Sequence, residues 1–491
     1  MLKKSSLFVC LLLLISSCSD NNETKIEREL YEYVSASIRE NSDVIAFGSM
    51  EIKEIIDKTD YQKIQMLNSI IAPEFAALNS VFGMDTPVYF IVEGPISRQG
   101  SPKRVTIFMK VKNPDDLAKE LEEERGFLVE SQGDIRYAED NEFILGFRDD
   151  LAIAIIQSEE FDAGKLIEEA FLATQGEMSI GKQHKILQTK GDFVIGMNLE
   201  SLYETSNTSL AQLNDTKQLE LEKMTKGSFT QTIVNFNKGN LSVESNNYFS
   251  DELKDAMFFS AEKPLKMKSL LSKGKDGAKI VGGFSSNIDI TKMEEFYTSY
   301  APDVIEMLND VTGGLYRFVG AGTVLSKLIS GNLGVLALAS EDSKDFADGV
   351  RVFLGSSEAG KKAFMLMRSE FDMPTGTEFD YVDEGIEILL PMSGHNLNEI
   401  KGEKKLKMPN GAEGFGSDGL CGFLNFDQLT YMGLSAEEAS ILDRFDYARL
   451  EGGNDGMKFV LQMKNTNDNF LKQMTQLAMS MVPLLMGGMS L

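Results

Sequence analysis

Tryptophan is absent from the 491 residues of this chain, and histidine occurs only twice. His184 and His395 lie far apart in the sequence. Neither belongs to an HExxH motif or to a set of cysteines at zinc-ligand spacing. These absences disfavour a histidine-rich metal site and a histidine base for catalysis. The lack of tryptophan also weakens a sugar-stacking function, although tyrosine or phenylalanine can serve instead.

Cysteine is also scarce, with three copies. Cys10 and Cys18 fall in the N-terminal leader, so Cys421 is the one thiol left and no internal disulfide is expected. Cys421 lies in the apolar run 420–424. We expect it to be a small buried hydrophobe there and not a nucleophile.

Positive charge is in deficit, because 49 Lys and Arg residues face 75 Asp and Glu residues and the net charge is −26. Such a chain repels phosphate backbones, so no nucleic-acid partner is expected. The acidic residues are spread along the chain, which is typical of a solvated surface. The hydrophobic fraction of 42% is enough for a sizeable core. The length predicts about three domains.

The clearest feature that is present is an export signal in residues 1–18. Lys3 and Lys4 precede an apolar stretch, Leu7 to Ile15, that is too short to span a bilayer. The following order of Ile, Ser, Ser and Cys18 resembles a bacterial lipobox. This resemblance implies cleavage before Cys18 and attachment of lipid to it. An ordinary secretory signal with a chance cysteine is the alternative.

Residues 19–42 are expected to form a polar tether and a short helix. The segment Ser19 to Thr24 has nothing to bury. It resembles the acidic signal by which Bacteroidota send lipoproteins to the outer leaflet of the outer membrane, although asparagines interrupt the acids here. We therefore expect a cell-envelope protein anchored in the outer membrane through Cys18, on the periplasmic face or at the cell surface.

A short pattern occurs four times: an apolar strand, then Ser or Asn, then an apolar residue, then an acid. The four copies are Ser49-Met50-Glu51, Asn198-Leu199-Glu200, Asn287-Ile288-Asp289 and Asn425-Phe426-Asp427. The spacing from 49 to 198 is long, from 198 to 287 short, and from 287 to 425 long again. This alternation predicts an internal duplication of a pair of units.

The elements that follow the first copy predict the order β-α-β-β-α-β, which is that of a ferredoxin-like unit, extended by a strand meander. The predicted fold class is therefore α+β, with tandem ferredoxin-like (βαββα) units and mostly antiparallel sheets. The predicted units are residues 43–180, 190–270, 279–395 and 415–491. The uncharged segment 475–491 is expected to be a helix packed on the core, because it is too short and too interrupted to span a membrane.

Several motifs of known chemistry are nearly matched. Gly355 to Lys362 resembles a phosphate-binding loop, but a lysine replaces the required hydroxyl, so a capped helix start is favoured. The stretch Gly414 to Gly419 lacks the GxSxG order of a nucleophile elbow. Gly320-Ala321-Gly322 lacks the third glycine of a dinucleotide fingerprint. Acidic sets in predicted turns are more typical of solvated carboxylates than of calcium sites; these are Asp149, Asp150, Asp380, Asp383 and Glu384.

Together with the lipobox, three segments resemble a family of Bacteroidota lipoproteins known as domain of unknown function 4836. They are the strand with Ser49-Met50-Glu51, Val105 to Leu121 and Asp192 to Leu202. The chain departs from that family just before Val44, where residues 39–43 replace the expected entry. The resemblance implies topology and brings no catalytic residue with it.

These observations predict a non-enzymatic envelope lipoprotein, a tethered scaffold that binds a protein, peptide or polymer on exposed sheet or loop surfaces. Cys18 is the one predicted site residue; no catalytic, cofactor or metal residue is predicted. A hydrolase built on paired carboxylates and a glycan-binding lipoprotein are the alternatives. Two carboxylates in a deep cleft would favour the enzyme, and a flat apolar or aromatic patch would favour the binding protein.

Overall fold

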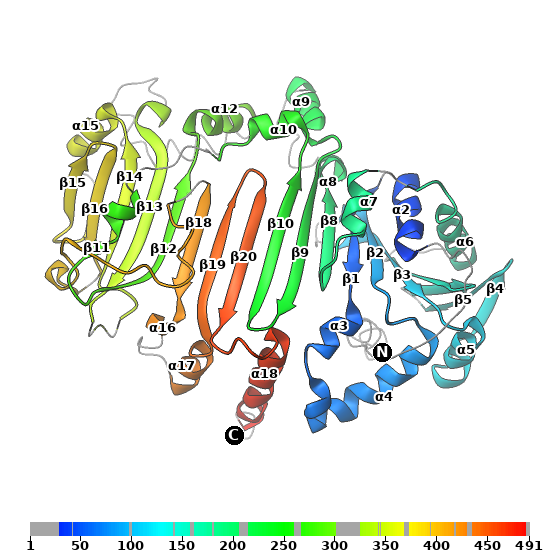
Figure 1. Cartoon of the computed structure of the whole chain (residues 1–491). Coiled ribbons are helices and arrows are strands. Elements are labelled where there is room, and N and C mark those ends of the chain that lie inside the picture. Colours follow the sequence, from blue (N-terminus) through cyan, green and yellow to red (C-terminus); the bar gives the residue numbers. More distant parts are fainter. Residues whose placement is uncertain are drawn as a thin grey trace.

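The computed structural model describes residues 29–487, apart from residues 42, 98–100, 141–142, 158–161, 179–180, 206–214, 260–266, 301–324, 342, 344, 368–372, 393, 417–418 and 430–434. Long antiparallel strands form one wide sheet, and helices lie at its ends and over parts of its faces (Figure 1). Cys18, the rest of the leader and Gly320-Ala321-Gly322 lie outside the described residues.

The first half of the molecule runs from α2 to α10. Its strands are β1 (Val44–Met50), β2 (Val88–Ile96), β3 (Pro102–Lys110), β4 (Val129–Gln132), β5 (Ile135–Asp140), β6 (Phe143–Arg148), β7 (Leu151–Gln157), β8 (Phe193–Asn198), β9 (Phe229–Asn237) and β10 (Asn240–Tyr248). Its helices are α2 (Leu30–Glu40), α3 (Ile52–Asp57), η1 (Tyr61–Lys63), α4 (Gln65–Val81), α5 (Pro114–Lys119), η2 (Glu120–Glu124), α6 (Ala163–Ala173), α7 (Lys182–Leu187), α8 (Leu199–Thr205), α9 (Asp215–Thr225) and α10 (Asp251–Ala256).

The second half runs from α11 to α18. Its strands are β11 (Lys273–Gly274), β12 (Lys279–Asn287), β13 (Ile329–Ala339), β14 (Gly349–Ser356), β15 (Glu378–Val382), β16 (Gly385–Pro391), β17 (Lys404–Lys405), β18 (Leu420–Asn425), β19 (Phe445–Gly453) and β20 (Gly456–Met463). Its helices are α11 (Met267–Leu271), α12 (Ile290–Tyr300), η3 (Leu325–Lys327), α15 (Glu358–Met367), η4 (Leu397–Glu399), α16 (Phe426–Leu429), α17 (Ala436–Leu442) and α18 (Phe470–Gly487).

Eighteen strands form the main sheet, and every pairing along it is antiparallel. Following the pairings gives the order β4-β5-β6-β7-β3-β2-β1-β8-β9-β10-β20-β19-β18-β12-β13-β14-β16-β15. The two halves meet at the β10–β20 pair. The four predicted units correspond to β1–β7, β8–β10, β12–β16 and β18–β20, and all four contribute to this sheet. The predicted α+β class with mostly antiparallel strands is confirmed.

The ferredoxin-like pairing is not what the structure shows. A split βαβ unit needs a parallel pair, and the described strands form none. Met50 at the end of β1 and Val88 at the start of β2 are register partners, so the helical connection between them begins and ends at the same end of the sheet. A connection of this kind makes neighbouring strands antiparallel, whereas a crossover to the opposite end makes them parallel.

In the first half, helices bury both faces of strands β1–β7. On one face, called face 2 here, α2, α6 and α7 pack on strand residues such as Phe47, Phe108 and Ile153. On the other, face 1, α3, α4 and α5 pack on strand residues such as Val88 and Met109. This is why β1 and β7 are apolar almost throughout and do not alternate with polar residues.

The second half has its main core on face 2. There α11 and the segment 397–415 pack on residues that include Leu336, Phe353 and Phe423. Cys421 belongs to the same cluster and is 1% exposed, which confirms the predicted buried cysteine. On face 1 the described clusters are smaller; one centres on Val281, Ala339 and Leu429, and another on Phe364, Ile386 and Ile388.

Helix α18 ends the described chain, and its Phe470 ring stacks on Phe236 of β9 at a centroid distance of 6.4 Å. The Gln473 side chain donates to the Asn465 and Asp468 carbonyls in the loop before the helix. The Asn469 side chain donates to the Phe236 carbonyl at 2.8 Å. Within the described residues, no helix has the length and apolar character needed to cross a membrane.

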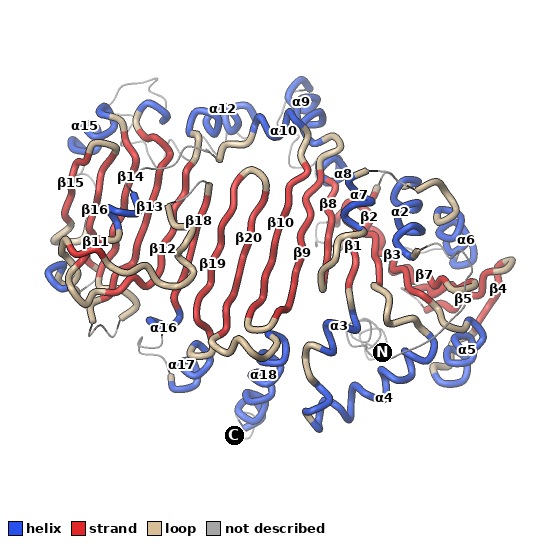
Figure 2. Tube along the Cα trace, in the orientation of Figure 1, coloured by secondary structure: helices blue, strands red, loops and turns tan. Residues whose placement is uncertain are grey.

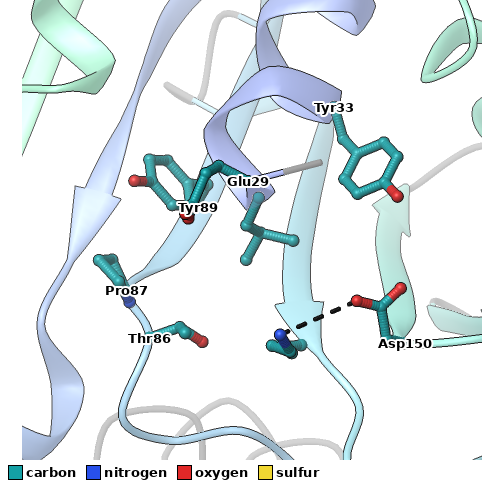
Figure 3. A pocket seen from close by; sticks show the side chains of 8 residues that line it. Glu29, Tyr33, Thr86, Pro87, Tyr89 and Asp150 are labelled. Atoms are coloured by element: carbon teal, nitrogen blue, oxygen red, sulfur yellow. Dashed lines mark ion pairs between the residues drawn. The ribbon is translucent and has the colours of Figure 1, made fainter. Parts of the chain in front are cut away.

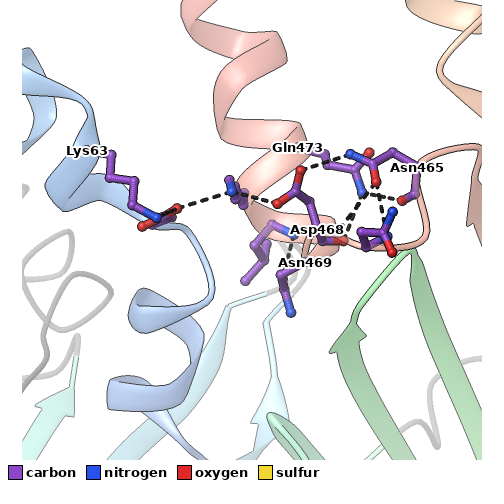
Figure 4. A network of polar contacts seen from close by, with 9 residues as sticks. Lys63, Asn465, Asp468, Asn469 and Gln473 are labelled. Carbon is purple, nitrogen blue, oxygen red and sulfur yellow. Dashed lines mark hydrogen bonds and ion pairs between the residues drawn. The ribbon is translucent and has the colours of Figure 1, made fainter.

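Polar contacts also tie α18 to the first half (Figure 4). The Lys472 ammonium lies 2.6 Å from an Asp468 carboxylate oxygen and 3.3 Å from one of Asp60, which in turn accepts from Lys63. These contacts connect the loop before η1 with the last helix of the chain.

Candidate functional site: a half-buried apolar row

The most extensive apolar feature of the sheet is a row of register partners on face 1, one from each of thirteen neighbouring strands. In order the row is Val88, Met50, Phe193, Val234, Val243, Phe459, Leu450, Gly422, Phe284, Val335, Val352, Ile388 and Phe379. Twelve of these residues are apolar side chains and the remaining one is glycine. Alternation along each strand produces the row, because residues two apart share a face.

Only the two ends of the row reach buried clusters. Val88 lies in the α3–α4–α5 cluster, and Ile388 lies in the Phe364 cluster. Between them, the stretch from Val234 on β9 to Val352 on β14 is half-buried, and the Phe284 side chain is 37% exposed. This stretch crosses eight strands, which is about 34 Å at the usual spacing of neighbouring strands.

The opposite face of the central strands is polar. Ser242 and Glu244 on β10, and Lys458 on β20, point to face 2, and Lys458 pairs with Glu244 at 3.9 Å. Arg449 on β19 lies on the same face and pairs with Glu413 and Glu451. Helices meet β9, β10, β19 and β20 at the strand ends (Figure 2). Strands β9, β10, β19 and β20 therefore have one polar, solvated face and one apolar face, which is the pattern of a sheet that packs on one side.

The first of two described cavities offers little room for a reacting substrate. The first holds about 90 Å³ between the start of α2 and strands β2 and β3, below the range of several hundred Å³ that is usual for ligand sites (Figure 3). It is lined by both Glu29 and Asp150. Asp150 faces Lys110 at 3.9 Å, and Glu29 begins α2 in a capping box with Glu32. Both carboxylates thus have structural partners.

Tyr33 and Tyr89 also line this cavity (Figure 3). Tyr89 is 7% exposed, and burial, followed by the nearby Glu51 and Glu29 charges, raises the pKa of its hydroxyl. A ring buried to this extent offers little face to a sugar. The second cavity, about 490 Å³, is an open groove along η1 and α4 lined by Tyr61 and Phe75.

The sequence motifs of known chemistry have structural explanations. Ser357 precedes α15 and its hydroxyl accepts from the Gly360 N–H at 3.1 Å, as expected for a capped helix start. Lys361, the lysine of the loop-like motif, donates to Glu358 and to the Asp383 carbonyl. Burial raises the pKa of the Cys421 thiol to about 11, so the thiolate is scarce at neutral pH.

The turn acids also have local partners or roles. Asp149 adopts φ of +52° in the β6–β7 turn, where its short side chain tolerates the left-handed conformation. Asp383 uses its backbone carbonyl to accept from Lys361. Of the two histidines, His184 packs edge-on against Tyr31 at 5.4 Å, while His395 lies between two aspartates.

Sequence reasoning did not find the apolar row. Its signal was present, because β9, β10, β19 and β20 each alternate apolar and polar residues. The row itself depends on the register of twelve strand pairs, many of them distant in sequence, and no local pattern specifies that register.

Comparisons with known proteins assign no family. The chain matches no family model and no curated protein. Three solved structures, crystal forms I, III and IV of TP0453, have TM-scores of 0.29, 0.28 and 0.26 at 10%, 11% and 10% identity. They cover 50%, 50% and 43% of this chain, and this chain covers 86%, 87% and 79% of theirs. At such TM-scores the similarity carries no argument about fold or function.

Proposed function

We propose that this protein is a non-enzymatic lipoprotein of the cell envelope that binds a protein partner through the apolar row on face 1. The observation that carries the proposal is the half-buried stretch from Val234 to Val352, which includes the exposed Phe284. An extended apolar surface of this kind typically marks a site of association. The net charge of −26 favours a partner whose apolar face is bordered by basic residues.

The anchor in this proposal is a lipid on Cys18, as the lipobox resemblance implies, with the segment to residue 42 as tether. Such an arrangement holds the sheet near the outer membrane and leaves its faces free for a second protein. Membership of the lipoprotein family named above is part of the same proposal. Mass spectrometry of the mature N-terminus tests directly whether Cys18 carries a lipid.

We further infer that the two halves arose by duplication, although not of a ferredoxin-like unit. β1 lies between β2 and β8, and β12 lies between β13 and β18. Outward from these, β2-β3-β7-β6 matches β13-β14-β16-β15, and β8-β9-β10 matches β18-β19-β20. Arginines occupy matching strands on face 2, the partly buried Arg104 on β3 and the buried Arg351 on β14. The repeated signatures at residues 49, 198, 287 and 425 fall at the ends of β1, β8, β12 and β18.

Photo-crosslinking tests the binding face. p-Benzoylphenylalanine replaces Phe284 on face 1 or Glu244 on face 2 in the full chain, and intact cells are irradiated. We expect one discrete adduct from position 284 and none of that mass from position 244. Val335→Asp, which puts a charge beside position 284 in the row, should remove the adduct.

The partner in the adduct is then identified by mass spectrometry and purified for a binding titration against wild type and the Val335→Asp variant. A tenfold or greater loss of affinity in the variant supports the proposal. Adducts of equal yield from both faces, or adducts with lipid alone, contradict it.

A further inference from the structure

A different cluster lies where the loop before β14 meets the turn after β16. Asp348 directly precedes β14, and its side chain is 1% exposed. The Ser340 N–H and the Ser343 hydroxyl both donate to it at 2.6 Å. Burial acts to raise the pKa of this carboxyl, but these hydrogen bonds and the nearby His395 outweigh it, and the pKa lies below its usual value. Asp348 is therefore a charged, fixed carboxylate at neutral pH.

His395 lies between two carboxylates. Its Nδ1 is 3.1 Å from Asp348 Oδ1, and its Nε2 is 2.9 Å from Asp345 Oδ2. The backbone holds this position, because the His395 N–H donates to the Met392 carbonyl and the Met392 N–H donates to the Asp348 carbonyl. The imidazole is thus set on the same backbone connection that positions Asp348.

Glu399 adds a third group. It ends η4, whose backbone is anchored by Leu397 and Ile400 at 6% and 0% exposure. Single ligand atoms of Asp348, His395 and Glu399 lie within 4.8 Å of one another. Three carboxylates, counting Asp345, therefore surround one imidazole, so the cluster carries excess negative charge whether or not the ring is protonated.

We propose that Asp348, His395 and Glu399 form a binding site for a divalent transition-metal ion such as Zn²⁺. Nδ1 of His395 is the nitrogen ligand and the two carboxylates are the oxygen ligands, a donor set that zinc accepts. Asp345 then accepts the hydrogen bond from Nε2–H. Such an outer carboxylate commonly orients a metal-binding histidine and fixes its tautomer.

Binding the ion requires only that the Glu399 carboxylate move slightly closer to the ligand atoms of Asp348 and His395. Ligand atoms about 2.0–2.2 Å from a tetrahedral ion lie a little over 3 Å apart. The 3.1 Å separation of Nδ1 from Asp348 already meets this value. Glu399 is exposed, so its carboxylate is free to rotate the remaining distance. Without metal, the imidazole lies in a polar network between two aspartates, and this is the competing explanation.

Calorimetric titration of Zn²⁺ into the metal-free full chain in detergent at pH 7.5 separates the two explanations. We expect one ion per chain. Glu399→Gln should weaken binding at least tenfold and His395→Gln should abolish it, while His184→Gln should bind as wild type. Binding should also weaken at pH 5.5, because protons compete for Nδ1.

Absence of saturable Zn²⁺ binding by wild type would overturn the proposal, as would unchanged binding by Glu399→Gln. Ca²⁺ serves as a second probe, since it takes oxygen ligands only. Ca²⁺ binding as tight as that of Zn²⁺ would contradict a nitrogen ligand. Circular dichroism checks that His395→Gln folds; if it does not, the exposed Glu399 variant still decides the outcome.

Discussion

The two halves of the sheet share one order of strand pairing but differ in how their faces are covered. In the first half helices bury both faces of β1–β7, and Phe47 on face 2 and Met109 on face 1 are 0% and 5% exposed. In the second half face 2 carries the main core, while Phe284 on face 1 is 37% exposed. Strand order alone therefore does not decide how each face of a sheet is covered.

The β1–β2 connection accounts for the burial of face 1 along the first strands. It supplies α3 and α4, which place Ile52, Ile56, Phe75 and Leu78 on face 1. The described part of the β12–β13 connection includes α12, in which Ile290 is buried.

The largest test of this comparison is a matched pair of phenylalanine truncations. Phe147→Ala removes a ring that is 0% exposed in the face 1 core of β6, and we expect a loss of about 3–5 kcal/mol in the free energy of unfolding. Phe284→Ala removes a partly exposed ring, and we expect a loss below about 1 kcal/mol. Urea titration followed by circular dichroism measures both. Equal losses would show that face 1 of the second half is packed as tightly as the first half.

The arginines at matching positions on β3 and β14 give the next test, because here the more buried residue lies in the second half. Arg351 and Glu387 are 6% and 10% exposed at the side chain, whereas Arg104 is 23% exposed beside Glu93. Arg351→Met leaves a buried carboxylate without its cation, and we expect a loss of about 3 kcal/mol. Arg104→Met should cost less, because water reaches that pair. A larger loss in Arg104→Met would contradict this order.

The Arg351→Met variant also has a defined pH dependence. Burial already raises the pKa of Glu387, and Arg351 opposes that rise. Without the arginine the folded state holds a proton on Glu387 that the unfolded state releases. Since the folded state then binds more protons, stability falls as pH rises from about 4.5 towards neutrality. Unfolding midpoints at pH 4.5 and 7 measure the effect relative to wild type.

Removing a helix cap should cost the same free energy of unfolding in both halves, because a cap stabilises only its own helix. Asn113 accepts from the Asp115 N–H at 2.9 Å before α5, and Ser357 accepts from the Gly360 N–H at 3.1 Å before α15. Asn113→Ala and Ser357→Ala should each cost about 1 kcal/mol. The same urea titration checks both. Clearly unequal losses would mean that the helices packed on the sheet also affect the stability of these first helical turns.

Local sequence signals predicted much of the fold but not its assembly. The four Ser or Asn signatures marked the ends of β1, β8, β12 and β18, and the Asn113-Pro114 start of α5 was also predicted. Both depend on neighbours in sequence. The antiparallel pairing of β1 with β2 was missed, because the same element order permits a crossover to either end of the sheet.

The candidate sites were harder to predict, because both join distant residues. Val243 and Phe459 are neighbours in the apolar row only through the β10–β20 pair. Asp348 and His395 meet because β14 and β16 are paired. The sequence argued against a histidine-rich site, and one histidine among carboxylates carries no spacing signature.

The smallest expected effect concerns the contact that joins the halves through Lys472. A hydrogen bond from Lys63 and a weaker effect of the hydrogen bond from Lys472 hold the pKa of Asp60 below its ordinary value of 3.8. The Asp60 carboxylate therefore stabilises the folded state at pH values above 3.8, and this contribution is lost as the pH falls further. Lys472→Gln should flatten the acid side of the stability profile slightly, with a difference from wild type that shrinks in 1 M salt because the groups are solvated. Lys254→Gln is the matched control, because its partner Asp251 lies 4.0 Å away within one half. Identical acid profiles for the two variants would mean that the sheet hydrogen bonds of β10 and β20 join the halves without help from this ion pair.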